Sequence, residues 1–156
     1  MSIRPSPAGQ FWSRTLTWLV IFLATLTTAS AQPANAEKPM ALRTIMEKMG
    51  QEMQKVTGAI AKEDWPAITL LATQIAQHAE PPPQEKVQII TWLGPQAGKF
   101  RGFDSQSHQS AMAMAQSASQ HDGAGVINAF AKVQSACMGC HQAFRKDYLQ
   151  HFYKLP

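Results

Sequence analysis

The spacing of apolar residues most constrains how this chain can fold. From residue 38 onwards they recur every three or four positions, which places them along one face of a helix, and no segment shows the alternation typical of a strand. In the segment 38–60 the apolar stripe consists of Leu42, Ile45, Met46, Met49, Met53, Val56 and Ile60. In the segment 123–152 it consists of Val126, Phe130, Val133, Cys137, Cys140, Phe144 and Tyr148. Both segments are therefore predicted to be amphipathic helices.

Residues that favour helix ends predict where the other helices begin and stop. Asp64 is a good N-cap for a second helix over 65–80, which the prolines at 81–83 must end. Asp122 is expected to cap the helix in the C-terminal segment, and Asp104 is expected to cap a third helix. The stripe of this third helix is weaker and consists of Ala111, Met114, Ala115 and Ala118.

The segment 84–103 is expected to be a long connection, with a helical stretch over 85–93 before Gly94 and Pro95. Four amphipathic helices joined by short turns and this one longer connection predict an all-α fold, an antiparallel up-down-up-down four-helix bundle.

The N-terminus has the features of a secretory signal peptide. Arg4 and Arg14 precede an apolar run of 11 residues, 16–26, which is shorter than the roughly 20 residues that a membrane span needs. Small residues follow, and an A-x-A signature predicts cleavage after Ala36 or after Ala31. We expect residues 1–36 to be removed on export to the periplasm, which leaves 37–156 as one domain without a membrane span.

The charge of the mature chain is close to balanced. Without Arg4 and Arg14, 12 Lys and Arg residues stand against 10 Asp and Glu residues. The chain contains no Lys/Arg tract and no glycine-rich phosphate loop. Nucleic acid is therefore not an expected partner.

The chemistry of the chain is concentrated in Cys137-Met138-Gly139-Cys140-His141, which contains its only two cysteines. A structural zinc site needs four Cys or His ligands, and there is no second cysteine pair to supply them. A redox C-x-x-C normally begins a helix beside a βαβ unit, where the helix dipole lowers the thiol pKa, whereas this pair is in the middle of a predicted helix. A structural disulfide suits an exported protein but leaves the histidine unexplained.

C-x-x-C-H is the attachment sequence of c-type haem. His141 follows Cys137 by four residues, so on a helix the two side chains stand within about 40° of each other. Both thiols and the imidazole are therefore expected to project towards the interior of the bundle. The motif predicts that the two cysteines bind one haem c through thioethers and that the adjacent histidine binds its iron.

A single C-x-x-C-H near the C-terminus of a four-helix bundle resembles the cytochrome c′ family, the class II c-type cytochromes. The resemblance covers roughly 37–153 and is most specific at "CMGCHQAFRK", with support from "EPPPQEKVQIITWLG" and "MEKMGQEM". It implies that Cys137 and Cys140 hold the haem, that His141 is the axial ligand of the iron, and that Arg145 lies beside this ligand. Homodimers are common in such proteins.

The sixth position on iron separates two functions within that family. The resemblance places Met46 on the first helix as the sixth ligand, as in the low-spin members, with Met49 or Met53 as alternatives. This ligation implies outer-sphere electron transfer between redox partner proteins, without enzyme activity. If no side chain binds there, the resemblance implies a five-coordinate protein that binds nitric oxide or carbon monoxide.

The sequence leaves the role of three aromatic residues open and predicts no ligand role for the remaining histidines. Trp92, Phe100 and Phe103 would cover a haem edge or belong to an ordinary core. The other four histidines lie in polar or terminal contexts and are expected to be exposed; they are His78, His108, His121 and His151.

Overall fold

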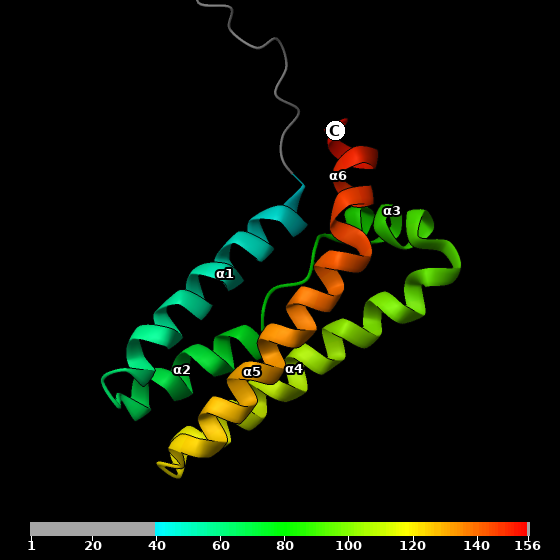
Figure 1. Cartoon of the computed structure of the whole chain (residues 1–156). Coiled ribbons are helices and arrows are strands. Elements are labelled where there is room, and N and C mark those ends of the chain that lie inside the picture. Colours follow the sequence, from blue (N-terminus) through cyan, green and yellow to red (C-terminus); the bar gives the residue numbers. More distant parts are fainter. Residues whose placement is uncertain (1–39, 156) are drawn as a thin grey trace, which may run out of the picture. The chain divides into compact units, whose positions relative to one another are not determined.

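The computed structural model describes residues 40–155, and all its regular elements are helices (Figure 1). The expected signal peptide, 1–36, lies outside the described residues. A 3-10 turn (Gly94–Gln96) precedes the fourth α-helix, and a π turn (His141–Arg145) joins the last two without a break in the helical backbone. The α-helices are α1 (Ala41–Ile60), α2 (Trp65–Ala76), α3 (Pro83–Leu93), α4 (Ala97–Ser119), α5 (Gly123–Cys140) and α6 (Lys146–Tyr153).

Four of these helices pack against one another, which confirms the expected all-α fold. α1 packs on α2, α2 on α4 and α4 on α5, an arrangement consistent with an up-down bundle (Figure 1). The short helix α3 packs beside the beginning of α4. None of the helices within residues 40–155 combines the length and the apolar character that a membrane span requires.

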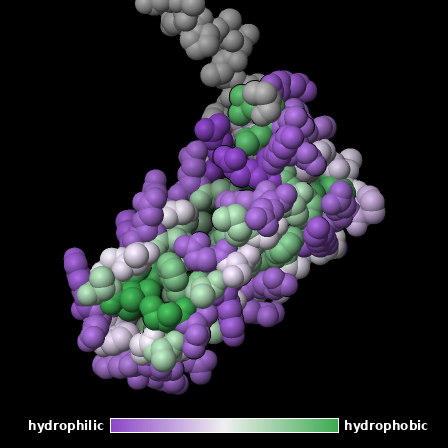
Figure 2. All heavy atoms as spheres, viewed as in Figure 1, coloured by the Kyte–Doolittle hydropathy of each residue, from purple (hydrophilic) through white to green (hydrophobic). Residues whose placement is uncertain are grey.

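The buried apolar side chains form two clusters. The main core lies between α1, α2, α4 and α5, and its fully buried members are Val56, Ile68, Ala72, Ile75, Ala111, Met114, Ala118, Val126 and Val133. The C-terminal cluster is built on Ile89, Leu93, Ala97 and Phe144, against which Leu42, Phe100, Phe103, Cys140, Tyr148 and Phe152 pack. Some apolar atoms also reach the surface, as in the region of α2 in Figure 2, where Leu70 is exposed.

The predicted caps at the start of α2 and α5 are confirmed. The Asp64 carboxylate accepts a hydrogen bond from the backbone N–H of Ala67 at 3.1 Å, and the Asp122 carboxylate accepts one from Gly125 at 2.9 Å. Each bond satisfies an N–H that has no partner within its helix. These two residues therefore begin their helices for the reason that the sequence indicates.

The prediction that Asp104 caps a third helix is wrong. α4 already begins at Ala97, because Ala97, Phe100 and Phe103 continue the apolar spacing and pack into the C-terminal cluster. Gly94 has a φ of +52°, which lets the chain turn between α3 and the next helix. Most of the expected connection 84–103 is therefore helical.

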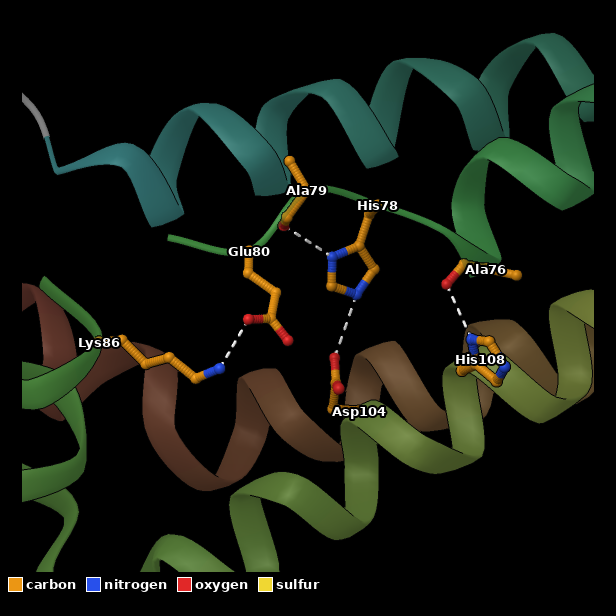
Figure 3. A network of polar contacts seen from close by, with 7 residues as sticks. All are labelled: Ala76, His78, Ala79, Glu80, Lys86, Asp104 and His108. Carbon is orange, nitrogen blue, oxygen red and sulfur yellow. Dashed lines mark hydrogen bonds and ion pairs between the residues drawn. The ribbon is translucent and has the colours of Figure 1, made fainter. Parts of the chain in front are cut away.

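The second helix also ends earlier than predicted, at Ala76, well before the prolines. The Ala76 carbonyl, which has no partner within the helix, accepts a hydrogen bond from Nδ1 of His108 on α4 at 2.8 Å. The following segment, 77–82, crosses to α3 as an extended connection (Figure 3).

A carboxylate from α3 caps the beginning of α1. The N-cap residue Met40 offers no side-chain acceptor, and α1 has no acidic residue in its first turn. Glu85 instead accepts hydrogen bonds from the backbone N–H groups of Ala41 and Leu42, both at 2.7 Å. The Tyr153 hydroxyl accepts a further bond from the Met40 N–H at 2.9 Å. Residues far apart in the sequence thus fix the start of α1 against α3 and α6.

We expect Glu85→Ala to lower the free energy of unfolding by about 1–2 kcal/mol, because two N–H groups and the helix dipole lose their partner. Equilibrium unfolding in urea measures this change. The matched control is Glu47→Ala, since Glu47 forms an exposed pair with Arg43 on α1 and should contribute less than about 1 kcal/mol. An equal loss in both variants would contradict the capping role of Glu85.

Candidate functional site

The two cysteines lie on the last turn of α5, three residues apart and both partly buried. Cys137 packs against the main core, whereas Cys140 packs against the C-terminal cluster. Met138, between them, is 58% exposed. The pair therefore lies where the two apolar clusters meet, with one face of the turn open to solvent.

Both thiols are held in the protonated form. Burial raises the pKa of Cys140 to about 11, and the charges of Cys137 and Asp104 contribute to the same shift. Burial also raises the pKa of Cys137, although the nearby Ser107 hydroxyl offsets part of this effect. Since the thiolate is the nucleophile in thiol–disulfide exchange, these environments disfavour a redox role for the pair.

The Ser107 side chain on α4 faces this turn. Ser107 is 6% exposed, and its hydroxyl oxygen has no hydrogen-bond partner of ordinary geometry among residues 40–155. Its effect on the pKa of Cys137 shows that the hydroxyl lies close to that sulfur. Unpartnered buried hydroxyls are uncommon, so this oxygen marks the contact between α4 and the cysteine turn as unusual.

A glycine between the cysteines lets α4 approach α5 closely. A Cβ atom added to Gly139 would lie 2.6 Å from Cε1 of Phe103, which is too close for any real contact. The Phe103 ring therefore packs directly on the backbone of the cysteine turn. It also packs edge-on against Phe144, with ring centroids 6.4 Å apart. Phe100 and Phe103 are thus part of the C-terminal cluster.

His141 begins the π turn and carries a neutral imidazole at pH 7. Burial lowers its pKa, and the positive charge of Arg145 lowers it further. A neutral imidazole has a free nitrogen lone pair, as a metal ligand must. π turns often occur at functional sites, and this one separates His141 from the regular helix that follows.

The expectation that His141 projects into the interior with the cysteines is wrong, because the structure leaves His141 exposed. The residue lies at the edge of the α5 stripe, and α4 covers α5 from the other side through the contact at Gly139. Among the described residues, no three His, Cys, Asp or Glu side chains are grouped as a bare metal ion would require. Arg145 is also exposed.

The methionines of α1 have two different environments. Met49 and Met53 are 9% and 8% exposed and belong to the main core. Met46 lies one turn earlier, is 36% exposed, and is a member of neither apolar cluster. Of the three, Met46 therefore has the thioether that core packing does not already engage.

The structure adds a pair that sequence reasoning missed, His78 and Asp104 (Figure 3). The His78 side chain is only 18% exposed, so the expectation of an exposed histidine is wrong. Its Nε2 lies 3.1 Å from a carboxylate oxygen of Asp104 on α4. The residues are 26 positions apart, and no local pattern connects them. Asp104 acts on the pKa of Cys140, which places this pair within electrostatic range of the cysteine turn.

We expect Gly139→Ala to lower the free energy of unfolding by about 1–3 kcal/mol, because the new methyl group forces the Phe103 ring away. Gly50→Ala is the matched control: Gly50 lies in the middle of α1 with nothing within 4 Å of an added Cβ, so alanine should stabilise this helix by up to about 1 kcal/mol. Urea unfolding of both variants measures the difference. Stabilisation by both substitutions would disprove the close contact.

Comparison of the chain with models of protein families, with curated proteins and with solved structures found no match.

Proposed function

We propose that the chain is an exported class II c-type cytochrome that binds one haem covalently and transfers electrons between redox partner proteins in the periplasm. The observation that carries the proposal is the C-x-x-C-H sequence on a helical turn that lies where two apolar clusters meet. Four packed helices provide the scaffold. No catalytic step is part of the proposal.

The donor chemistry of the described residues fits this cofactor. Cys137 and Cys140 are protonated thiols at the edge of the apolar interior, which suits thioether bonds to a largely apolar porphyrin. Cys140 packs within the C-terminal cluster, whose aromatic rings offer a dry surface. A bound haem supplies an iron that accepts and donates single electrons.

The axial roles follow from the state of each side chain. His141 is neutral at pH 7, so its imidazole binds a metal without first losing a proton. Burial is the main cause of this lowered pKa, and the positive charge of Arg145 adds to it. Met46 has a thioether free of the main core and is proposed as the sixth ligand. A methionine thioether bound to the iron of a haem would favour its reduced state and raise the potential.

The rival chemistries of the cysteine pair receive less support. A thiol oxidoreductase needs a thiolate near neutral pH, whereas the pKa of Cys140 is raised to about 11. Within residues 40–155, the side chains around the pair do not provide a third and fourth ligand for zinc.

Covalent attachment is tested on the protein isolated from the periplasm. We expect the visible absorbance to stay with the polypeptide after denaturation, and the intact mass to exceed that of the chain by one haem. Cys137→Ser/Cys140→Ser should remove both signals. Met138→Ala is the matched control, because this exposed side chain lies between the cysteines and should leave both unchanged. A colourless protein with a Cys137–Cys140 disulfide would refute the proposal.

Ligation by Met46 is tested by absorption spectra with and without carbon monoxide. The unmodified protein should show narrow low-spin bands and no prompt response to the gas. Met46→Ala should become high-spin and bind the gas at once. Met49→Ala and Met53→Ala should keep the low-spin spectrum but lose about 2–5 kcal/mol of stability, because both side chains are buried in the main core.

The same spectra decide between electron transfer and gas binding. If the unmodified protein is already high-spin and binds carbon monoxide at once, Met46 is not a ligand. The family's five-coordinate, gas-binding function would then replace electron transfer.

A further inference from the structure

His78 is held between two hydrogen-bond acceptors. Its Nδ1 lies 3.0 Å from the Ala79 carbonyl oxygen, and its Nε2 lies 3.1 Å from the Asp104 carboxylate (Figure 3). A carbonyl and an ionised carboxylate can only accept, so both contacts are hydrogen bonds only when both ring nitrogens carry a proton. The geometry therefore favours the imidazolium form of His78, a cation paired with an anion.

The charges around this pair all favour its ionised form. The hydrogen bond to Asp104 is the main cause of the raised pKa of His78, and the Glu80 carboxylate in the same connection adds to it. In return His78 lowers the pKa of Asp104, with help from His108 on α4 and Lys86 on α3. Burial opposes both shifts without reversing them.

Loss of one His78 proton weakens the link between segment 77–82 and α4, because the imidazole loses its positive charge. The remaining proton stays on Nε2, since the Asp104 carboxylate is a stronger acceptor than a carbonyl, so Nδ1 would present a lone pair to the Ala79 carbonyl oxygen, and two acceptors repel each other. Because the pKa of His78 is raised, the imidazolium is complete below the ordinary pKa of an imidazole and is lost as the pH rises through the raised value.

The pair lies beside the cysteine turn. Asp104 follows Phe103, whose ring packs on Gly139, and its charge raises the pKa of Cys140. Ser107, one turn further along α4, faces Cys137. One face of α4 thus contacts the cysteine turn and also carries the acceptor for His78.

We propose that His78 and Asp104 form a redox-linked proton site: uptake of one electron at the cysteine turn is accompanied by uptake of a proton from solvent onto the imidazole ring of His78. This inference rests on the proposed function, because the electron enters through the covalently bound haem. The electron comes from the redox partner, and the only bond that forms in the chain is Nδ1–H of His78. Oxidation reverses both steps.

The direction follows from Coulomb's law. One added negative charge near the cysteine turn attracts a cation at His78, so the reduced protein binds the proton more tightly than the oxidised protein. By linkage, a proton on His78 makes reduction more favourable. The reduction potential must therefore fall as the pH rises through the titration of His78.

The test is the reduction potential of the isolated holoprotein between pH 5 and pH 9. We expect about threefold to tenfold tighter proton binding in the reduced state. A tenfold difference lowers the potential by about 59 mV across the titration. His78→Gln should abolish this decrease, and Asp104→Asn should move it to lower pH, because the carboxylate no longer holds the proton.

His121→Gln is the matched control. His121 stacks on Trp65 at the connection between α4 and α5, with ring centroids 5.5 Å apart, and should leave the pH profile unchanged. A second readout is the pKa of the His78 imidazole from NMR spectra of the reduced and the oxidised protein. This pKa should be higher in the reduced protein.

The outcomes separate this inference from the proposed function. If the protein carries no covalent haem, both fail. If it carries haem but His78→Gln keeps the pH profile of the unmodified protein, only the redox-linked site is overturned. If His78→Gln lowers the stability but leaves the pH dependence of the reduction potential unchanged, the pair of His78 and Asp104 has only a structural role.

Discussion

The contact between the Phe103 ring and the backbone of Gly139 determines how α4 and α5 fit together. Because Gly139 lies between the two cysteines, the same contact sets where they stand relative to the apolar interior. A larger residue would push the Phe103 ring away from the turn that carries Cys137 and Cys140. Ser107 lies on the same side of α4, close to Cys137 but without a hydrogen-bond partner within residues 40–155. Close packing at this contact therefore leaves the Ser107 hydroxyl without a hydrogen-bond partner among the described residues.

α1 is positioned by different interactions. It packs on α2, while its first residues are fixed by Glu85 and Tyr153 from α3 and α6. These residues lie beside the C-terminal cluster, in which Tyr148 also donates a hydrogen bond to the Met40 sulfur at 3.3 Å. The rotation of α1 follows from these anchors and from the burial of Met49 and Met53. Met46 is left partly exposed as a consequence, which makes it the thioether best able to take another role.

Sequence reasoning succeeded where local chemistry decides the structure. The caps Asp64 and Asp122 and the stripe around Met114 depend on neighbours within a few residues, and all three are confirmed.

Sequence reasoning failed where residues far apart in the chain decide the structure. α4 begins before Asp104 because Phe100 and Phe103 meet Phe144 from the other end of the chain. His78 is covered because Asp104, 26 residues away, offers a carboxylate. The π turn at His141 has no sequence pattern that the spacing of apolar residues could reveal. The cysteine motif itself was evident at once, whereas its burial and its charged neighbours required the fold.

The distribution of charge around the cysteine turn follows a single physical logic. The ionisable groups of the turn itself are neutral at pH 7: both thiols are protonated because burial raises their pKa values, and the imidazole of His141, which the structure leaves exposed, is neutral because its pKa is lowered. Charged groups lie around the turn: Arg145 is exposed to solvent, and Asp104 pairs with His78. Because the turn itself is neutral, a change of charge there can be compensated only by the charged groups around it. His78 belongs to a hydrogen-bonded pair that raises the pKa of its imidazole above the ordinary value, so compensation by a proton is expected there first.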